Sequence, residues 1–438
     1  MKKILILTLF ISTILSAQNE QRIILELEQA INLALEKNAE LKVAQMEVDK
    51  SRQKLWEARS GLFPKLDASG QYQRYIELPV IFLPPGSPFG PTLKIGADNS
   101  FIASASLSVP IFAWGLYKGI GLASDGLNIS QENYRSIKNK VVGDVKKAFL
   151  AVLLTRETKD VMQQSLKNAE DNFENIKKLN SAGTLSDYDV LRAEVQVANL
   201  RPVVLQMENN YKLSTEALKT TIGLNASQEI DVVGELNFQE PYYLPDEQEI
   251  INELLSNNPQ LAILENQIEL NQRSVSLERA AYFPTLAGFG SYQYQTQAND
   301  FKFSDYNWVK TFVVGLQLQI PIFNGFKTQT RINQAEIGLN QVIEQKRNFT
   351  EAIKTQALSI LYRVEQAVKR IEGQNKTVSQ AEEGYRIAKK RLENSLATQL
   401  EVNDAELALR QAKLNRLQAV YDLKVAESDL DTILGRIK

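Results

Sequence analysis

The segment Phe63-Pro64-Lys65-Leu66 recurs as Phe283-Pro284-Thr285-Leu286, at an offset of 220 residues (284 − 64). The same offset relates five nearby residues to identical ones: Asn38, Leu41, Arg59, Gly70 and Tyr72 match Asn258, Leu261, Arg279, Gly290 and Tyr292. Three further matches have offsets of 211 or 212: Pro110-Ile111-Phe112 with Pro321-Ile322-Phe323, Ala193-Glu194 with Ala405-Glu406, and Ile222-Gly223 with Leu434-Gly435. The chain is an internal duplication, which favours a pseudosymmetric wall over a single catalytic pocket.

Each half predicts two strands. Four segments alternate between apolar and small or polar residues, at about 65–76, 99–110, 285–296 and 309–320. Each is close to the ~9–11 residues that a tilted transmembrane strand needs, and such alternation is typical of barrel strands with one face on lipid. Soluble hairpins with one face on a core are the alternative. Four segments of similar length in a duplicated chain favour membrane strands.

The strand pairs are separated by sequences that predict very long helices. Residues 114–180 and 326–394 are rich in Ala, Leu, Val and charged side chains and contain no proline. At 1.5 Å per residue, ~65 helical residues extend ~100 Å. Turns near 181–184 and 396–398 lead to return helices at about 187–222 and 401–434, with heptad-like apolar spacing. The expected fold class is a mixed α and β membrane protein built from a duplicated helix–strand–strand–helix unit.

These patterns divide the chain into four parts. Residues 1–17 have a basic start, a short apolar run and small residues before a cut after Ala17, which predicts a signal peptide. A single transmembrane anchor is the alternative, but the run is shorter than the ~20 residues of a spanning helix. Residues 18–224 form the first repeat, 225–245 a linker and 246–438 the second repeat.

Composition argues against several classes of function. The chain has no Cys and no His, so disulfides, thiolate metal sites and a cysteine-linked lipid are not expected, and the commonest general base is missing. We identify no catalytic, metal-binding or cofactor-binding residues, and expect no enzyme. A carboxylate-dependent hydrolase stays possible in principle, without a recognisable constellation. The formal net charge of −2 gives no sign of nucleic acid as a partner.

Four membrane strands require more than one copy of the chain. Open strand edges in hydrocarbon leave N–H and C=O groups unpaired, at several kcal/mol each. The smallest barrels have about eight strands, so at least two copies would share one barrel. The strand count alone does not choose three copies over two or four.

Three motifs together resemble a known family. They are the duplicated (Leu/Tyr)-Phe-Pro-x-Leu step, the Pro-Ile-Phe return to helix that leads to a glycine, and GTLSDYDVLRAE at residues 183–194. The mature chain resembles a TolC-type outer membrane efflux protein. The resemblance implies a homotrimer with a shared twelve-stranded β-barrel in outer membrane lipid and a periplasmic α-helical barrel. It also implies an exit duct of a tripartite efflux pump or type I secretion system, with a periplasmic adaptor (membrane fusion protein) and an inner membrane transporter as partners.

The resemblance also indicates site residues. Acidic side chains after the second-repeat turn form a periplasmic entrance constriction in the family, and Glu401 and Asp404 match them. The alternative is ordinary N-terminal helix acids that favour the macrodipole. Asp189 and Arg192, at the matching place in the first half, are latch candidates. A basic partner that the family often has in the second-repeat turn is absent, since Ala397 and Thr398 stand there.

Two further groups complete the expected sites. The adaptor-docking tips are Gly183, Thr184, Ala397 and Thr398. The expected membrane-interface aromatics are Phe112, Trp114, Trp308 and Phe323, because aromatic rings favour the headgroup boundary. Core packing at the strand–helix junction is the alternative for these rings. A periplasmic coiled-coil adaptor without a pore is the alternative function, but it would leave the four alternating segments unexplained.

Overall fold

The computed structural model describes residues 23–394 and 396–436. The expected signal peptide, 1–17, lies outside these residues. Within them, no helix is both long and apolar enough to cross a membrane. The chain divides into two compact units. The helical unit consists of the described residues of 1–42, 136–258 and 353–438, and the sheet unit of 43–135 and 259–352, so each unit draws on both sequence halves.

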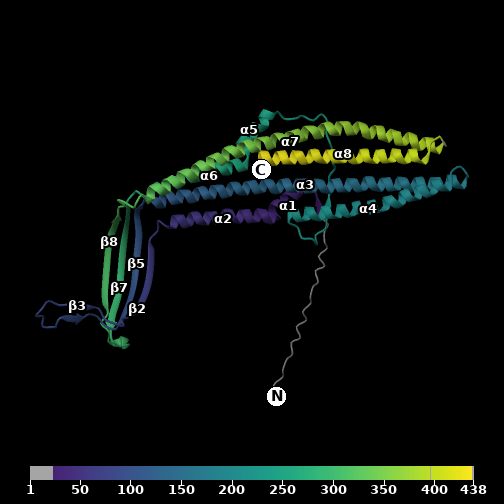
Figure 1. Cartoon of the computed structure of the whole chain (residues 1–438). Coiled ribbons are helices and arrows are strands. Elements are labelled where there is room, and N and C mark those ends of the chain that lie inside the picture. Colours follow the sequence, from purple (N-terminus) through teal and green to yellow (C-terminus); the bar gives the residue numbers. More distant parts are fainter. Residues whose placement is uncertain (1–22, 395, 437–438) are drawn as a thin grey trace, which may run out of the picture. The chain divides into compact units, whose positions relative to one another are not determined.

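The sheet unit contains one four-stranded antiparallel sheet in the order β2-β5-β7-β8 (Figure 1). The strands are β2 (Lys65–Arg74), β5 (Asn99–Ala113), β7 (Thr285–Ala298) and β8 (Val309–Gln319). A β-bulge at Ile111 separates the pairs of Pro110 and Phe112. A short hairpin, β3 (Val80–Phe82) with β4 (Thr92–Lys94), is inserted between β2 and β5, and a 3-10 turn, η1 (Phe303–Asp305), lies between β7 and β8.

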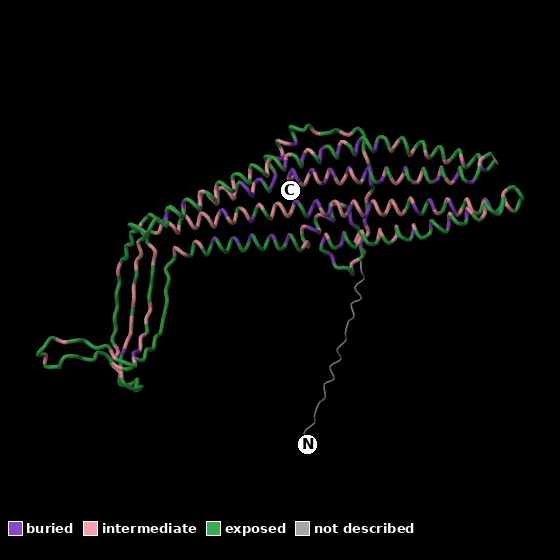
Figure 2. The backbone as a smooth tube through the Cα atoms, viewed as in Figure 1, coloured by how far each residue is buried: buried purple, intermediate pink, exposed green. Residues whose placement is uncertain are grey.

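The register sorts the residues of the sheet onto two chemically different faces. Leu107, Gly290 and Val314 lie in one row, and the apolar side chains of β8 on this face are strongly exposed, with Val314 at 68% and Leu316 at 69%. The opposite face has a polar row made of Ser69, Ser104, Gln293 and Thr311. The two outer strands, β2 and β8, are exposed over most of their length (Figure 2). The apolar face is therefore open in the described chain.

Helices lead into and away from the sheet. α2 (Ala39–Ser60) and α6 (Pro259–Ala280) end just before the two Phe-Pro steps, because proline cannot supply the amide that a continuing helix needs. α3 (Trp114–Ser181) and α7 (Lys327–Glu393) follow β5 and β8 and contribute to both units. Within the sheet unit, ion pairs join α6 to both long helices: Arg273 to Asp125 at 2.6 Å, and Arg279 to Glu336 at 2.8 Å.

The helical unit packs around a large apolar core. Its other helices are α1 (Leu27–Lys37), α4 (Asp187–Ile222), α5 (Glu247–Asn257) and α8 (Gln399–Leu434), and β1 (Ile23–Leu25) pairs in parallel with β6 (Ile230–Val232). The core side chains that are under 2% exposed include Val145, Val152, Leu218, Ile371 and Leu423. The linker takes part in this core through Ile230, Val232 and Leu236, and Glu157 accepts a hydrogen bond from the Leu236 amide at 3.0 Å. A smaller buried cluster, with Met162 and Val197 among its members, lies between α3 and α4.

One hydrogen bond of the helical unit occurs twice, once in each sequence half. The Asn38 side chain donates to the Thr221 carbonyl at 2.8 Å, and the matching Asn258 donates to the Ile433 carbonyl at 2.7 Å. Both asparagines are C-caps, of α1 and α5, and both acceptors lie in the last turn of a return helix, α4 or α8. The last carbonyls of a helix have no partner within the helix, so each asparagine satisfies one of them. This contact explains why Asn38 recurs as Asn258.

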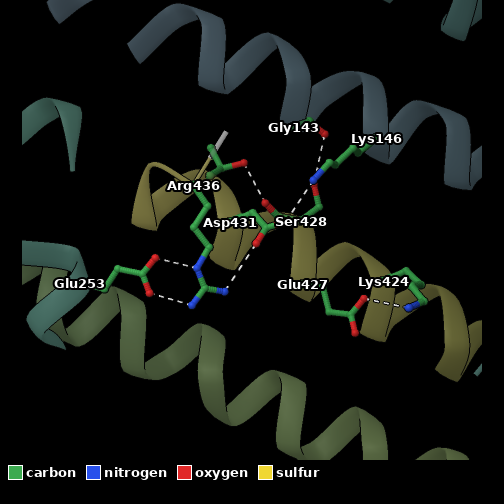
Figure 3. A network of polar contacts seen from close by, with 9 residues as sticks. Gly143, Lys146, Glu253, Lys424, Glu427, Ser428, Asp431 and Arg436 are labelled. Carbon is green, nitrogen blue, oxygen red and sulfur yellow. Dashed lines mark hydrogen bonds and ion pairs between the residues drawn. The ribbon is translucent and has the colours of Figure 1, made fainter. Parts of the chain in front are cut away.

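Charged contacts hold the C-terminal end of α8 (Figure 3). Arg436 makes a two-pronged pair with Glu253 of α5, at 2.8 and 2.7 Å, and lies 3.7 Å from Asp431. Asp431 also binds Lys146 of α3 at 3.0 Å. Hydrogen bonding from Arg436 lowers the pKa of Glu253, against the opposing effect of burial. The network fixes α8 against α3 and α5.

The lowered pKa of Glu253 predicts a pH dependence of stability. A carboxylate with a lowered folded-state pKa stabilises the fold above its unfolded-state pKa, and this contribution is lost as pH falls through the folded-state value. The wild type should therefore lose more thermal stability between pH ~6 and ~3 than Glu253→Gln does. Melting curves followed by circular dichroism check this. Equal losses in both proteins would contradict a stabilising role for ionised Glu253.

Gly223 offers a second test, of the junction between α4 and α1. It ends α4 with φ of 90°, and a Cβ there would lie 2.8 Å from the Lys37 carbonyl oxygen. Gly183 has φ of 77° but open space around it. Gly183→Ala should cost only the roughly 1–2 kcal/mol of left-handed backbone. Gly223→Ala should cost clearly more, because the backbone of α1 must also move. Unfolding of the two variants in denaturant compares them, and equal losses would contradict the close approach.

Candidate functional site

The two helical turns begin their return helices in the same way. Ser186 caps α4 and Thr398 caps α8, and each forms a reciprocal capping box with the acidic residue three positions on. Asp189 accepts from the Ser186 amide at 3.1 Å and hydroxyl at 2.7 Å, and Glu401 accepts from the Thr398 amide at 3.2 Å. These bonds satisfy amides that the first helical turn leaves without partners. Asp189 and Glu401 thus both act as helix caps.

Glu401 has a second contact that sequence reasoning missed. Arg391, in the last turn of α7, lies 3.5 Å from the Glu401 carboxylate and donates to the Leu396 carbonyl at 3.0 Å. The family resemblance places the basic partner within the turn, where Ala397 and Thr398 stand, whereas in this chain it lies at the end of the preceding helix. The basic run Lys389-Lys390-Arg391 is the signal that could have indicated it. Both side chains are about half exposed, so the pair contributes at most ~1 kcal/mol.

Arg192 and Asp404 line one groove between α4 and α8. The groove has a volume of about 440 Å³, and its polar lining also includes Gln196, Asn199 and Asn403. The structure thus brings the first-half candidate Arg192 and the second-half candidate Asp404 to the same surface. In the described part of the chain, Asp189 bonds Ser186 while Arg192 faces this groove. Opposite charges lining one groove attract each other, which favours close approach of α4 and α8.

The lining of this groove also includes a charged cluster that is largely buried. Glu406 is 6% exposed, pairs with Arg410 at 3.1 Å one turn on, and accepts a hydrogen bond from Ser165 of α3. Arg410 also donates to the Ser165 hydroxyl at 3.0 Å. Burial, and after it the Glu406 carboxylate, raises the pKa of the nearby Tyr385 phenol. In the sequence Glu406 stands out only as a repeated residue, although a Glu and an Arg four positions apart on one helix are a signal for pairing.

The predicted docking tips are exposed loops with apolar neighbours. Gly183 and Thr184 are exposed, and Thr184 folds back on the Leu179 carbonyl through its amide and hydroxyl, at 3.0 and 2.7 Å. At the second tip Thr398 is exposed and Ala397 half-buried. Large apolar side chains stand beside these residues with high exposure: Tyr188 at 69% and Leu396 at 69%. Each tip therefore offers apolar surface beside polar caps.

The four predicted interface aromatics lie at strand ends of the sheet unit. Trp114 has its ring centroid 6.1 Å from that of Phe283, with Lys118 above it at 4.9 Å. Phe112 and Phe323 are 38% and 76% exposed. Trp308 precedes β8 and stacks on Tyr294 at 4.7 Å. Trp114 therefore packs within the chain, whereas Phe323 contacts the Phe326 ring at 5.5 Å between centroids and stays mostly exposed.

Removing the counter-charge of Glu406 tests the buried cluster. Arg410→Met should destabilise the fold by ~3–5 kcal/mol, because it leaves a buried carboxylate without its partner. The double variant Glu406→Met/Arg410→Met should recover most of that loss. Denaturant unfolding measures both variants. Arg201→Met is the matched control, because Arg201 and Glu170 also form an Arg–Glu pair, but one that is 67% and 44% exposed, so its loss should cost under ~1 kcal/mol. If Arg201→Met loses as much unfolding free energy as Arg410→Met, the buried cluster has no special role in stability.

Within the described residues, a four-stranded sheet with one open apolar face, continued in the chain by long helices with matching capped turns, is typical of a membrane channel protein. The chain belongs to the outer membrane efflux protein family, whose model matches residues 30–236 and 250–436. The family prediction is confirmed, and the chain is an outer membrane channel protein that serves efflux or secretion, with a large periplasmic helical part.

Three known proteins illustrate the similarity. The chain is 21% identical over 417 residues to the probable outer membrane lipoprotein SilC of Salmonella typhimurium, covering 94% of this chain and 86% of SilC. It is 22% identical over 417 residues to the cobalt-zinc-cadmium resistance protein CzcC of Cupriavidus metallidurans, covering 94% and 90%. The Campylobacter jejuni CmeC outer membrane channel matches in fold, with a TM-score of 0.77, 17% identity and coverage of 93% and 85%.

Proposed function

We propose that this chain is the passive exit duct of a tripartite export system. Three copies form a homotrimer whose twelve strands close one β-barrel in outer membrane lipid, and their helices form one periplasmic barrel. An inner membrane transporter supplies the energy, and a periplasmic adaptor joins it to the duct. The duct itself binds no cofactor and performs no catalytic step. In this proposal residues 1–17 are removed on export, and repeats 18–224 and 246–438, joined by 225–245, are the duplicated wall segments.

The open sheet of the chain is the observation that supports this proposal most strongly. β2 and β8 each pair on one side within the described residues, and the face that carries Val314 and Leu316 is strongly exposed. Closed barrels remove strand edges, and a lipid-facing apolar band is what such a face fits. A coiled-coil adaptor without a pore would have no use for either feature.

The helical unit also has an unpartnered stripe that fits neighbouring copies. Five apolar side chains at heptad-like spacing on α4 are each at least half exposed: Tyr188, Leu191, Val195, Leu205 and Leu213. Apolar residues that recur at this spacing pack against another helix. In the proposed assembly this stripe meets a helix of the next copy, so the helices form a closed wall.

The helical tips form the proposed entrance. Glu401 and Asp404 of each copy form an acidic constriction, and Arg391 and Arg192 counter these charges when the entrance is closed. Asp189 supports the constriction by capping α4. Gly183, Thr184, Ala397 and Thr398, with exposed apolar neighbours, dock the adaptor. At the other end of the duct, Phe112, Trp114, Trp308 and Phe323 border the headgroup region of the membrane.

Single-channel conductance in a planar bilayer tests the duct and the constriction together. The purified oligomer should show a small cation-selective conductance, because a ring of carboxylates attracts cations. Glu401→Gln/Asp404→Asn should raise the conductance and reduce the selectivity, since it removes the charges and the Arg391 tie. Gln can replace Glu in a capping box, so the helix start is preserved.

The matched control removes two carboxylates from the linker. Glu235→Gln/Glu240→Gln changes the net charge by the same amount and should leave both conductance and selectivity unchanged. If the entrance variant behaves like this control, the constriction must lie elsewhere in the chain, but the duct proposal still holds. If the protein is folded and inserted in the bilayer but shows no conductance, the duct proposal is wrong and the coiled-coil adaptor is favoured.

A further inference from the structure

The duplication makes each strand pairing of the first half a quantitative guide to the second half. Strand β2 corresponds to β7 at an offset of 220, and β5 corresponds to β8 at an offset of 211. Applied to the β2–β5 pair Leu66 with Leu107, these offsets give Leu286 with Leu318, which is the observed β7–β8 pair. Two further pairs transfer equally well: Lys65 with Ser108 gives Thr285 with Gln319, and Tyr72 with Phe101 gives Tyr292 with Phe312. The offsets therefore carry strand register from one half to the other.

The junction between the halves, β5 with β7, has no counterpart within the described chain. The same offsets convert β5 into β8 and β7 into β2, which are the two outer strands of the sheet and do not pair with each other in the described chain. Neighbouring strands of this sheet alternate in direction, so β8 and β2 are antiparallel to each other, as β5 and β7 are. An edge β8 of one copy can thus meet an edge β2 of the next in the geometry of the existing junction.

We propose that β8 of one copy pairs with β2 of the next in the register of the β5–β7 junction. This inference rests on the proposed shared barrel and adds its residue pairing. Adding 211 to the β5 residue and subtracting 220 from the β7 residue converts each observed pair into a predicted one. The pair Ser106–Ser291 predicts Gln317 opposite Gln71 of the next copy, and Ala105–Tyr292 predicts Leu316 opposite Tyr72 of the next copy. Polar residues meet polar ones and apolar residues meet apolar ones. A register shifted by one residue would place each side chain on the wrong face.

The end of β8 supports the same partner. Within the chain, β5 continues past Ser108 to Ala113 although β2 pairs with it only up to Ser108, because β7 pairs with the extra residues. The matching segment 320–324 follows the end of β8 at Gln319 and is not in a strand. Its apolar side chains are largely exposed, Ile322 at 93% and Phe323 at 76%. The transferred register pairs Phe323 with Leu66 of the next copy, itself 74% exposed, and supplies the missing strand neighbour.

Cysteine cross-linking tests the register, since the natural sequence has no Cys. The full-length variant Gln71→Cys/Gln317→Cys, purified as the oligomer in detergent and mildly oxidised, should form reducible covalent bands between chains on a denaturing gel. Ser106→Cys/Ser291→Cys is the matched control, because it is the template pair and should form a disulfide within one chain. Residues two positions away on the next strand lie ~7–8 Å off, near the limit for a disulfide. Ser69→Cys/Gln317→Cys and Gln73→Cys/Gln317→Cys should therefore cross-link much more slowly.

The outcomes separate the register from the proposed function. If either shifted pair cross-links faster than Gln71→Cys/Gln317→Cys, the proposed register is wrong. The register is also wrong if the Gln71→Cys/Gln317→Cys oligomer conducts but forms no cross-link while the control pair oxidises. Both results would leave the duct proposal intact. A monomeric protein in detergent would overturn the shared barrel itself. Complete oxidation of the Gln71 pair gives a largest band that counts the copies in the ring. A band of three chains supports the homotrimer, and one of four would replace it while keeping the register.

Discussion

Hydrogen bonding along the outer sides of β2 and β8 is the constraint on which the rest of the architecture depends. A backbone N–H or C=O left unpaired in hydrocarbon costs several kcal/mol, and a strand edge presents a row of them. Four strands of one chain cannot remove these edges, whereas a ring of copies removes them all. In the proposed ring of copies, symmetry brings the helices that continue from the strands together between copies as well. In that arrangement the exposed apolar stripe on α4 can pack against a helix of the next copy.

The two halves of the duplication use the same contacts at the ends of their return helices. Asn38 and Asn258 satisfy the last turns of α4 and α8 with one type of hydrogen bond. Ser186 and Thr398 open the same two helices with one type of capping box. These contacts need only neighbours that each half brings with it. The halves differ at segment 320–324, which follows β8 and has no strand neighbour within the described chain, and which in the proposed ring would meet the next copy.

Sequence reasoning reached the features that local pattern encodes. Period-two alternation, heptad spacing and the Phe-Pro steps depend on neighbours within a few residues, and they led to the family that the comparisons confirm. The buried cluster could not be reached in this way, because Ser165 and Glu406 are 241 positions apart and meet only through helix packing. Arg391 was missed for a smaller reason, since a long side chain at the end of one helix reaches the first turn of the next. The basic run at 389–391 shows which side chains could make this contact, but the side-chain rotamers decide which of them does.

The contacts of α8 become weaker along its length, which bears on where the duct opens. Its C-terminal end is fixed by the Asn258 bond and by the two-pronged Glu253–Arg436 pair. Glu406 and Arg410 tie the helix to α3 through a buried cluster, and a partnered buried charge resists displacement because separation would leave it unpaired. The first turn is held by the half-exposed Arg391–Glu401 pair, which water and salt screen. Local opening begins where contacts are most exposed, so in the proposed duct the Arg391–Glu401 pair is the first polar contact of α8 to break, while Gln399 and Val402, both 3% exposed, still pack its first turn.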